Sequence, residues 1–101
     1  METDLEKLEV VHNPGESRFE MWMDGNLSKL DYRENGNTIV MMHVGVPLEY
    51  RGRGLAGKIT QAGLEYAKEK KLRVIPMCSY VAAYIRRHPE YAELTHQQAG
   101  E

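Results

Sequence analysis

The sequence predicts an α+β fold, in which a mostly antiparallel sheet of about five strands is joined by one long helix after the fourth strand and a short helix near the C-terminus. Three features of the 101 residues support this fold. Apolar and polar residues alternate between turn signals from Leu8 to Val46, as in half-buried strands. From Gly54 the apolar spacing becomes helical. A shorter apolar run and a second helical pattern then follow.

The first half of the chain fits four strands joined by tight turns. We expect these strands at about Leu8–His12, Arg18–Met23, Leu27–Arg33 and Thr38–Val46. Asp24-Gly25-Asn26 and Asn35-Gly36-Asn37 are typical of hairpin turns, because Gly and Asn tolerate positive φ. The fourth strand is apolar at nearly every position, which favours an inner strand covered on both faces of the sheet.

The second half of the chain fits a long helix, a short strand and a second helix. The long helix starts after Gly54 and ends in lysines, and its pattern is set by Leu55, Ile59, Ala62, Tyr66, Lys68, Lys70 and Lys71. The fifth strand, from Arg73 to Cys78, contains a proline, which indicates an edge or a bulge. Ser79 is suited to cap a short helix that runs to about Arg87. A strand, helix and strand in succession should place strands four and five in parallel.

Size and composition fit one domain, which we place at residues 5–94, followed by a tail without fixed structure at residues 95–101. Apolar residues make up 42% of the chain, which is too many for a disordered protein. The formal net charge of −2 argues against nucleic-acid binding. The N-terminus lacks the basic and apolar segments of a targeting signal, and no apolar run reaches the roughly 18 residues of a membrane span. We therefore expect a cytoplasmic protein with no membrane partner.

A glycine-rich loop joins the fourth strand to the long helix, within Val46 to Lys58. Glycines allow a ligand to approach the backbone closely, and the first N–H groups of a helix are unpaired donors at the positive end of its dipole. Arg51, Arg53 and Lys58 add positive charge to this segment. The loop is therefore predicted to bind phosphate, although a plain glycine-rich connector is the alternative.

Two phosphate motifs fit this loop incompletely. Gly52-x-Gly54-x-x-Gly57 matches the dinucleotide fingerprint, but the acidic residue expected about 20 positions later is replaced by Met77-Cys78-Ser79. Gly52 to Lys58 also approaches the P-loop pattern, but Ile59 stands where a Ser or Thr should coordinate magnesium. Both motifs belong to parallel sheets, whereas hairpin strands precede the loop here.

A third motif, Arg51-x-x-Gly54-x-Ala56, resembles the (Gln/Arg)-x-x-Gly-x-(Gly/Ala) pyrophosphate motif of the GNAT acetyltransferases. The order of strands and helices from Leu8 to Arg87 resembles that family as well. Only Asn13 to Ser17 separate the first two strands, where GNAT enzymes normally have two helices. The chain is therefore similar to the minimal, single-domain GNAT-like family, which shares its His-x-x-Val-Pro and Cys-Ser-Tyr segments.

This resemblance implies acetyl-coenzyme A (acetyl-CoA) as cofactor and acetyl transfer to an amine or peptide that the sequence does not identify. It places the pantetheine arm between strands four and five, with the thioester near Val44, Gly45 and Cys78. The implied cofactor-binding residues are Val44, Val46, Arg51, Gly52, Arg53, Gly54, Leu55 and Ala56. The alternative is a non-catalytic module that binds acyl-CoA or a partner protein. We expect a monomer or a weak homodimer.

Three side chains are candidates for catalysis. Cys78, near a helix N-terminus, is a possible nucleophile or a buried apolar residue. It is the single cysteine of the chain, which excludes an internal disulfide and a multi-cysteine metal site, and no metal is expected. His43, on the apolar fourth strand, is either a base or a core histidine. The small family often has Thr-Glu after this histidine, where this chain has Val44-Gly45. By resemblance, Tyr84 would protonate the departing thiolate, although packing explains it equally well.

Overall fold

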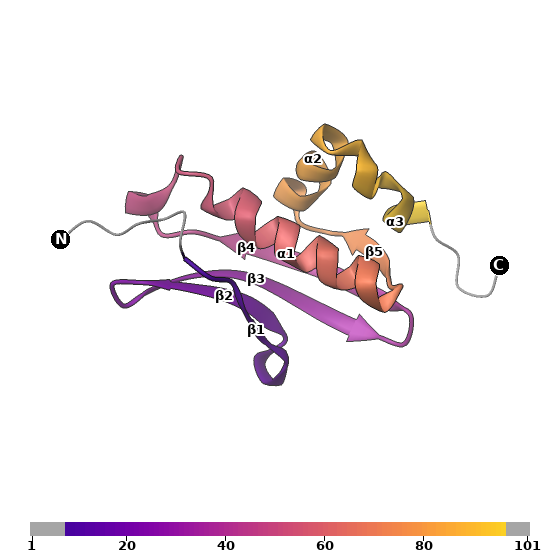
Figure 1. Ribbon diagram of the computed structural model, residues 1–101, viewed down its shortest axis with the longest axis horizontal. Coiled ribbons are helices and arrows are strands. Elements are labelled where there is room, and N and C mark those ends of the chain that lie inside the picture. Colours follow the sequence, from indigo (N-terminus) through magenta and orange to yellow (C-terminus); the bar gives the residue numbers. More distant parts are fainter. Residues whose placement is uncertain (1–7, 97–101) are drawn as a thin grey trace.

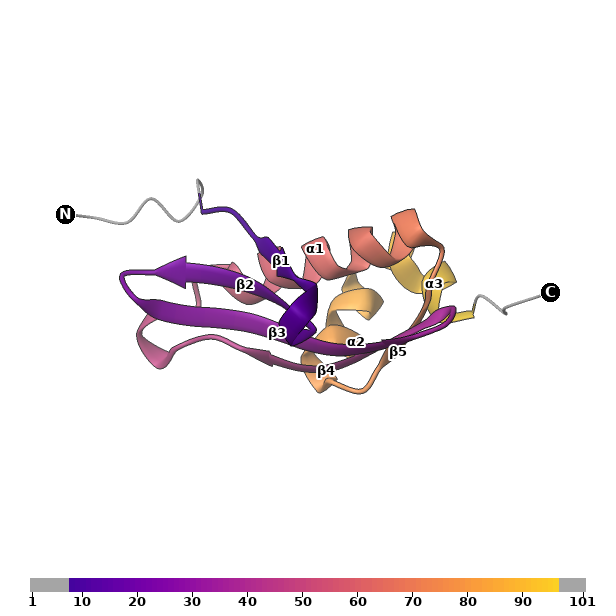
Figure 2. The same cartoon turned by 90° about the horizontal axis from the view of Figure 1, so that it is seen from below.

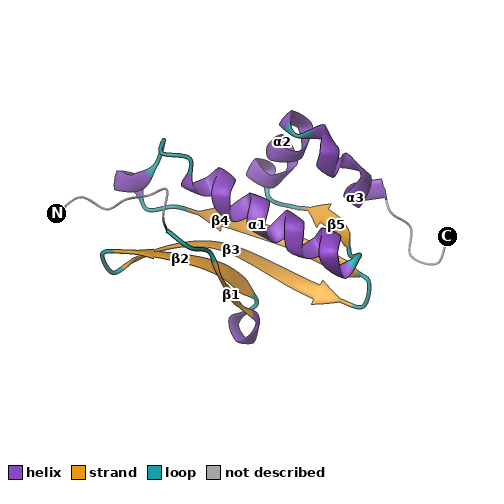
Figure 3. Cartoon of the chain, viewed as in Figure 1, coloured by secondary structure: helices purple, strands orange, loops and turns teal. Residues whose placement is uncertain are grey.

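The computed structural model describes residues 8–96, which form one five-stranded sheet in the order β1-β2-β3-β4-β5 (Figure 1). The strands are β1 (Val11–Asn13), β2 (Arg18–Met23), β3 (Asn26–Asn35), β4 (Thr38–Gly45) and β5 (Arg73–Pro76). The helices are α1 (Leu55–Lys70), α2 (Ser79–Arg87) and α3 (Ala92–His96), with 3₁₀ turns η2 (Pro14–Glu16), η3 (Leu48–Tyr50) and η4 (Pro89–Tyr91) (Figure 3). Neighbouring strands are antiparallel except β4 and β5, which are parallel. The predicted α+β fold is confirmed.

Several element bounds differ from the predictions. β1 begins at Val11 and not Leu8, because only three residues pair with β2. Cys78, not Ser79, holds the N-cap position of α2, and its side chain makes no capping hydrogen bond. Helix α3 was not predicted, and its Thr95 and His96 lie in the segment expected to be an unstructured tail. The rest of that tail, residues 97–101, lies outside the described residues.

The core lies between the sheet and the helices. Helix α1 crosses one face of the sheet over β2, β3 and β4, while α2 and α3 contact its β4–β5 side (Figure 1, Figure 2). Gly63 lets α1 approach closely, since a Cβ there would lie 3.3 Å from Leu30 Cδ1. Burial of each large apolar side chain contributes about 1.5–3 kcal/mol. The core includes Met21, Met23, Leu30, Ile39, Met41, Ile59, Leu64, Val74 and Val81.

A β-bulge in β4 changes which face its residues occupy. His43 pairs with Asp31 and Met41 pairs with Tyr32, so Met42 is an extra residue between these pairs. One extra residue reverses the alternation of side chains beyond it. Met41 is therefore buried while His43 is exposed. β4 is an inner strand, as predicted, but the expectation that it is covered on both faces, with His43 buried, is wrong.

An aromatic cluster joins β1, β2 and β3 to α1. The His12 ring stacks on Phe19 at 4.2 Å between centroids, and its Nε2 lies 2.6 Å from Tyr32 Oη. Burial lowers the pKa of His12 below its ordinary value. The Tyr66 hydroxyl donates to Glu34 Oε1 at 2.6 Å, and this bond, with burial, raises the pKa of Tyr66 to about 12. The cluster therefore favours a neutral His12 and a protonated Tyr66.

The lowered pKa of His12 predicts a pH-dependent stability. The ordinary pKa of histidine is 6.5, so as the pH drops below this value the unfolded chain binds a proton at this site more readily than the folded protein does. The free energy of unfolding therefore decreases as the pH decreases. Urea denaturation between about pH 7.5 and 5.5 should show the free energy of unfolding falling more steeply in the wild type than in His12→Gln, which keeps a polar group beside Tyr32. Equal slopes for the two proteins would contradict this assignment.

Candidate functional site

The glycine loop leads into α1 through a tight turn and two left-handed residues. In η3, Arg51 N–H donates to Leu48 O at 3.2 Å, which fixes the start of the loop. Gly52 and Gly54 then have φ of +80° and +81°, a region that side chains rarely adopt. Gly54 is the N-cap of α1 and provides no side-chain cap, so the first N–H groups of the helix remain available to an anion.

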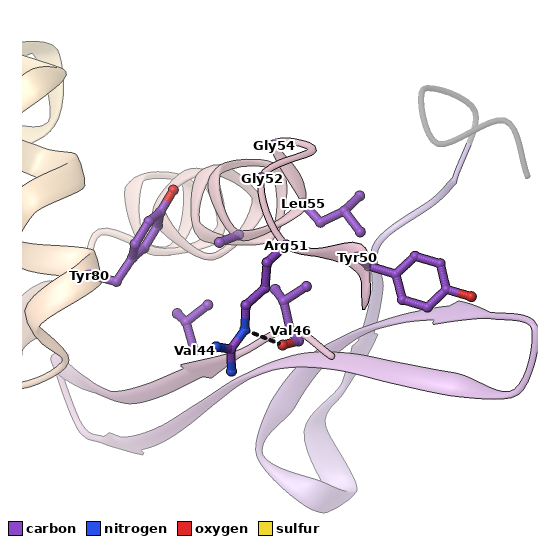
Figure 4. Close-up of a pocket in the computed structure, with 9 residues that line it drawn as sticks. Val44, Val46, Tyr50, Arg51, Gly52, Gly54, Leu55 and Tyr80 are labelled. Atoms are coloured by element: carbon purple, nitrogen blue, oxygen red, sulfur yellow. Dashed lines mark hydrogen bonds between the residues drawn. The ribbon is translucent and has the colours of Figure 1, made fainter. Parts of the chain in front are cut away.

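A hollow of about 380 Å³ lies beside this loop, bounded by the end of β4, the start of α1 and the first turn of α2 (Figure 4). A Cβ placed on Gly52 or Gly54 would meet no atom within 4 Å, so the space above the loop is open. The described residues that line the hollow are Val44, Val46, Tyr50, Arg51, Gly52, Gly54, Leu55, Ala56 and Tyr80. The hollow thus combines an apolar wall, from β4 and the start of α1, with the open backbone of the glycine loop.

The hollow exists because β4 continues after β5 has turned away. Pairing between these parallel strands ends at Met41 and Pro76, and Cys78 N–H makes a last hydrogen bond to Met41 O at 3.0 Å. β4 continues to Gly45, while the chain after β5 enters α2. The backbone of β4 beyond Met41 therefore has no strand partner on its β5 side. Extended ligands that carry amides can pair with such an edge.

The residues predicted for the cofactor fall into two groups. Those that line the hollow are Val44, Val46, Arg51, Gly52, Gly54, Leu55 and Ala56. Arg53 is exposed and does not line it. Lys58, which the sequence associates with phosphate, donates from Nζ to Leu8 O instead. A local sequence pattern can predict the backbone of a loop, but the direction of its long side chains depends on the rest of the fold.

Sequence reasoning did not include Tyr50 and Tyr80 in the site. Tyr50 lines the hollow, and its hydroxyl donates to Asp24 Oδ2 at 3.2 Å in the β2–β3 turn. Tyr80 lines it from the first turn of α2. A Cβ on Gly57 would lie 3.4 Å from Tyr80 Oη, so this glycine lets the tyrosine approach α1. The signal for Tyr80 was its place two residues after Cys78, at the start of a helix that faces the loop.

The structure does not bring the three catalytic candidates into one cavity. Cys78 is half-buried, packs against the core, and its carbonyl accepts a hydrogen bond from Ala82 N–H at 3.0 Å. His43 is exposed beyond the bulge. Tyr84 lies one turn after Tyr80, stacked on His88 at 3.9 Å between centroids. None of these three lines the hollow that we describe.

The environment of Tyr84 favours its protonated form. Burial, followed by the nearby Tyr80, Glu90 and Glu65, raises the pKa of Tyr84 above its ordinary value. Its ring centroid lies 6.4 Å from that of Tyr80. Tyr84 therefore lies next to Tyr80 and outside the hollow, as a phenol that keeps its proton.

Two further properties concern the described part of the chain. Within residues 8–96, no helix combines the length and apolar character needed to cross a bilayer. The same residues contain no group of three or more His, Cys, Asp or Glu side chains placed to hold a metal ion.

Comparisons with known proteins bear on the family and the fold of this chain. A sequence model of the GCN5-related N-acetyl-transferases matches residues 18–94. Protein NATD1 of Gallus gallus is 31% identical over 94 residues, which cover 90% of this chain and 86% of that protein. Protein NATD1 of Homo sapiens is 31% identical over 85 residues, which cover 81% and 75%. The NMR solution structure of a GCN5-like protein from Staphylococcus aureus matches with a TM-score of 0.69 and 29% identity, and 86% of each chain is covered.

Proposed function

The chain belongs to the GCN5-related N-acetyltransferase family, and from this premise we propose that it binds acetyl-CoA and transfers the acetyl group to an amine. One observation carries the proposal: a single hollow connects the glycine loop at the start of α1 to the unpaired edge of β4. Acetyl-CoA has matching parts, since its pyrophosphate suits the loop and its extended pantetheine arm suits the strand edge. We propose that the protein works in the cytoplasm.

Acetyl transfer combines a change of covalent bonds with stabilisation of an oxyanion and two proton transfers. The amine nitrogen attacks the thioester carbon, an N–C bond forms and the C–S bond breaks. The developing oxyanion needs donors, and we propose that N–H groups of β4 beyond Met41, where pairing with β5 has ended, supply them. The nitrogen loses a proton and the departing sulfur gains one.

We assign the proton donor for sulfur to Tyr80, because its side chain lines the hollow. Tyr84, the donor implied by the sequence, is the second candidate. The described lining residues include neither a histidine nor a carboxylate, so we propose that water takes the amine proton. His43 on the exposed side of β4 is the alternative base.

The absence of a histidine or carboxylate among the described lining residues also favours a second candidate function. A protein with this hollow alone would bind acyl-CoA without turning it over, as a carrier or an interaction module. The two functions differ in one measurable property, the release of free coenzyme A.

Incubation with acetyl-CoA and a panel of polyamines, lysine peptides and peptide N-termini should release free thiol and form an N-acetylated amine. We expect turnover only with amine present, and we expect it to continue in Cys78→Ala, since Cys78 does not line the hollow. Thiol release and product mass are the readouts. Calorimetric binding of acetyl-CoA without turnover on any amine would support the non-catalytic module instead.

The same incubation tests Cys78 as an acetyl acceptor. If Cys78 carries the acetyl group, intact-protein mass spectrometry should show one added acetyl that hydroxylamine removes, and Cys78→Ala should lose both this adduct and turnover. An adduct that survives hydroxylamine would indicate a lysine.

A further inference from the structure

The side chain of Arg51 crosses the hollow that the cofactor would occupy. Its guanidinium lies next to Val44 and Val46, not over the glycines, and its Nε donates to Val46 O at 3.0 Å (Figure 4). Val46 directly follows β4, so this carbonyl lies at the end of the strand edge that has no partner. Arg51 thus occupies an acceptor on the wall that an amide-bearing ligand would use.

The interaction that holds Arg51 there is weak for a charged group. Its recorded partner is a neutral carbonyl, and among residues 8–96 no carboxylate forms an ion pair with this guanidinium. The side chain is exposed, which screens its charge further. A pyrophosphate would attract a guanidinium more strongly than a neutral carbonyl does, because it carries the opposite charge and can accept two parallel hydrogen bonds.

Movement of Arg51 away from Val46 needs no change in the backbone. Its N–H is fixed by Leu48 O, and its backbone is extended, with φ −71° and ψ 153°. The space around Gly52 and Gly54, one and three residues further along the loop, is open. Rotation of the side chain alone can therefore bring the guanidinium from the β4 wall to the phosphate cradle.

We propose that Arg51 competes with the cofactor's arm for the Val46 carbonyl, and that the pyrophosphate of the cofactor draws Arg51 away from this carbonyl. This inference rests on the proposed function, because the ligand must carry both an anionic end and an amide-bearing arm. When the anion binds at the glycine loop, it attracts Arg51 and frees the carbonyl for the arm. The two halves of the ligand then bind with positive coupling, and by linkage each half favours the other equally.

The test uses the two halves separately, with pantetheine for the arm and ADP for the pyrophosphate. One exchanged hydrogen bond corresponds to a factor of about two to ten in affinity. Titrations followed by amide NMR shifts should show pantetheine binding about two to ten times more tightly to Arg51→Ala than to the wild type. Saturating ADP should tighten pantetheine binding to the wild type by a similar factor and leave Arg51→Ala unchanged.

Arg53→Ala is the matched control, since it removes the same charge from the same loop but does not line the hollow. It should retain both the wild-type affinity for pantetheine and the coupling to ADP. Weaker pantetheine binding by Arg51→Ala, or coupling that persists in it, overturns the competition and indicates that Arg51 supports the loop. Coenzyme A binding without any pantetheine binding also overturns it. If the wild type binds neither coenzyme A nor its halves, the proposed function fails first.

Discussion

Gly54→Asp should nearly abolish coenzyme A binding, because it places a carboxylate at the N-terminus of α1. Gly54 has φ of +81° and no neighbouring atom within 4 Å of a Cβ, so a short side chain has room to project into the cradle. Two like charges about 4 Å apart repel by about 4 kcal/mol at an effective dielectric of 20. Solvent screening reduces this to about 2–3 kcal/mol, which corresponds to a loss of roughly 30-fold to 150-fold in affinity. Calorimetric titration with coenzyme A measures this loss of affinity directly.

Gly54→Asn provides the control. Asn and Asp have nearly the same shape, both tolerate a left-handed backbone, and both are good N-caps. Any loss of binding shared by the two variants reports bulk, strain or competition for the helix N–H groups. The difference between them reports charge. Equal affinities in Asp and Asn variants, both folded by circular dichroism, would place the anion elsewhere.

Tyr80→Phe should lower kcat for acetyl transfer about 100-fold, the lower end of the range for a positioned proton donor. The phenol lines the hollow, and the substitution removes only its hydroxyl. The affinity for coenzyme A should change little, since the glycine loop and its backbone N–H groups are left intact. Rates at saturating substrate, compared with calorimetric affinities, separate the two effects.

Tyr84→Phe is the natural comparison, because Tyr84 is a half-buried phenol one turn further along the same helix. We expect less than about a tenfold loss of kcat from it. If Tyr84→Phe is the damaging variant and Tyr80→Phe is active, the donor that the sequence implied is the right one. If neither variant changes the rate, sulfur leaves as a thiolate protonated by water.

Local patterns determined most of the fold. Asp24 and Gly25, both with positive φ, close a hairpin in which Met23 pairs with Asn26, and Gly36 starts a second one, as the sequence predicts. The helical spacing from Leu55 predicted α1 to within one residue of its end. These signals depend on the conformations of adjacent residues, so a single sequence contains them. The glycine loop is of the same kind, because its motif specifies a backbone path.

Contacts between distant segments decided the rest. Met42 becomes a bulge only through the pairing of β3 with β4, and that extra residue turns His43 away from the core. On α2, the rotation of the helix selects Tyr80 for the hollow, and it is set by burial of Val81 and Ile85. Arg51 belongs to the predicted motif, yet its guanidinium meets a carbonyl five residues earlier. Strand register, helix rotation and long rotamers follow from packing between elements, and no pattern along one segment encodes them.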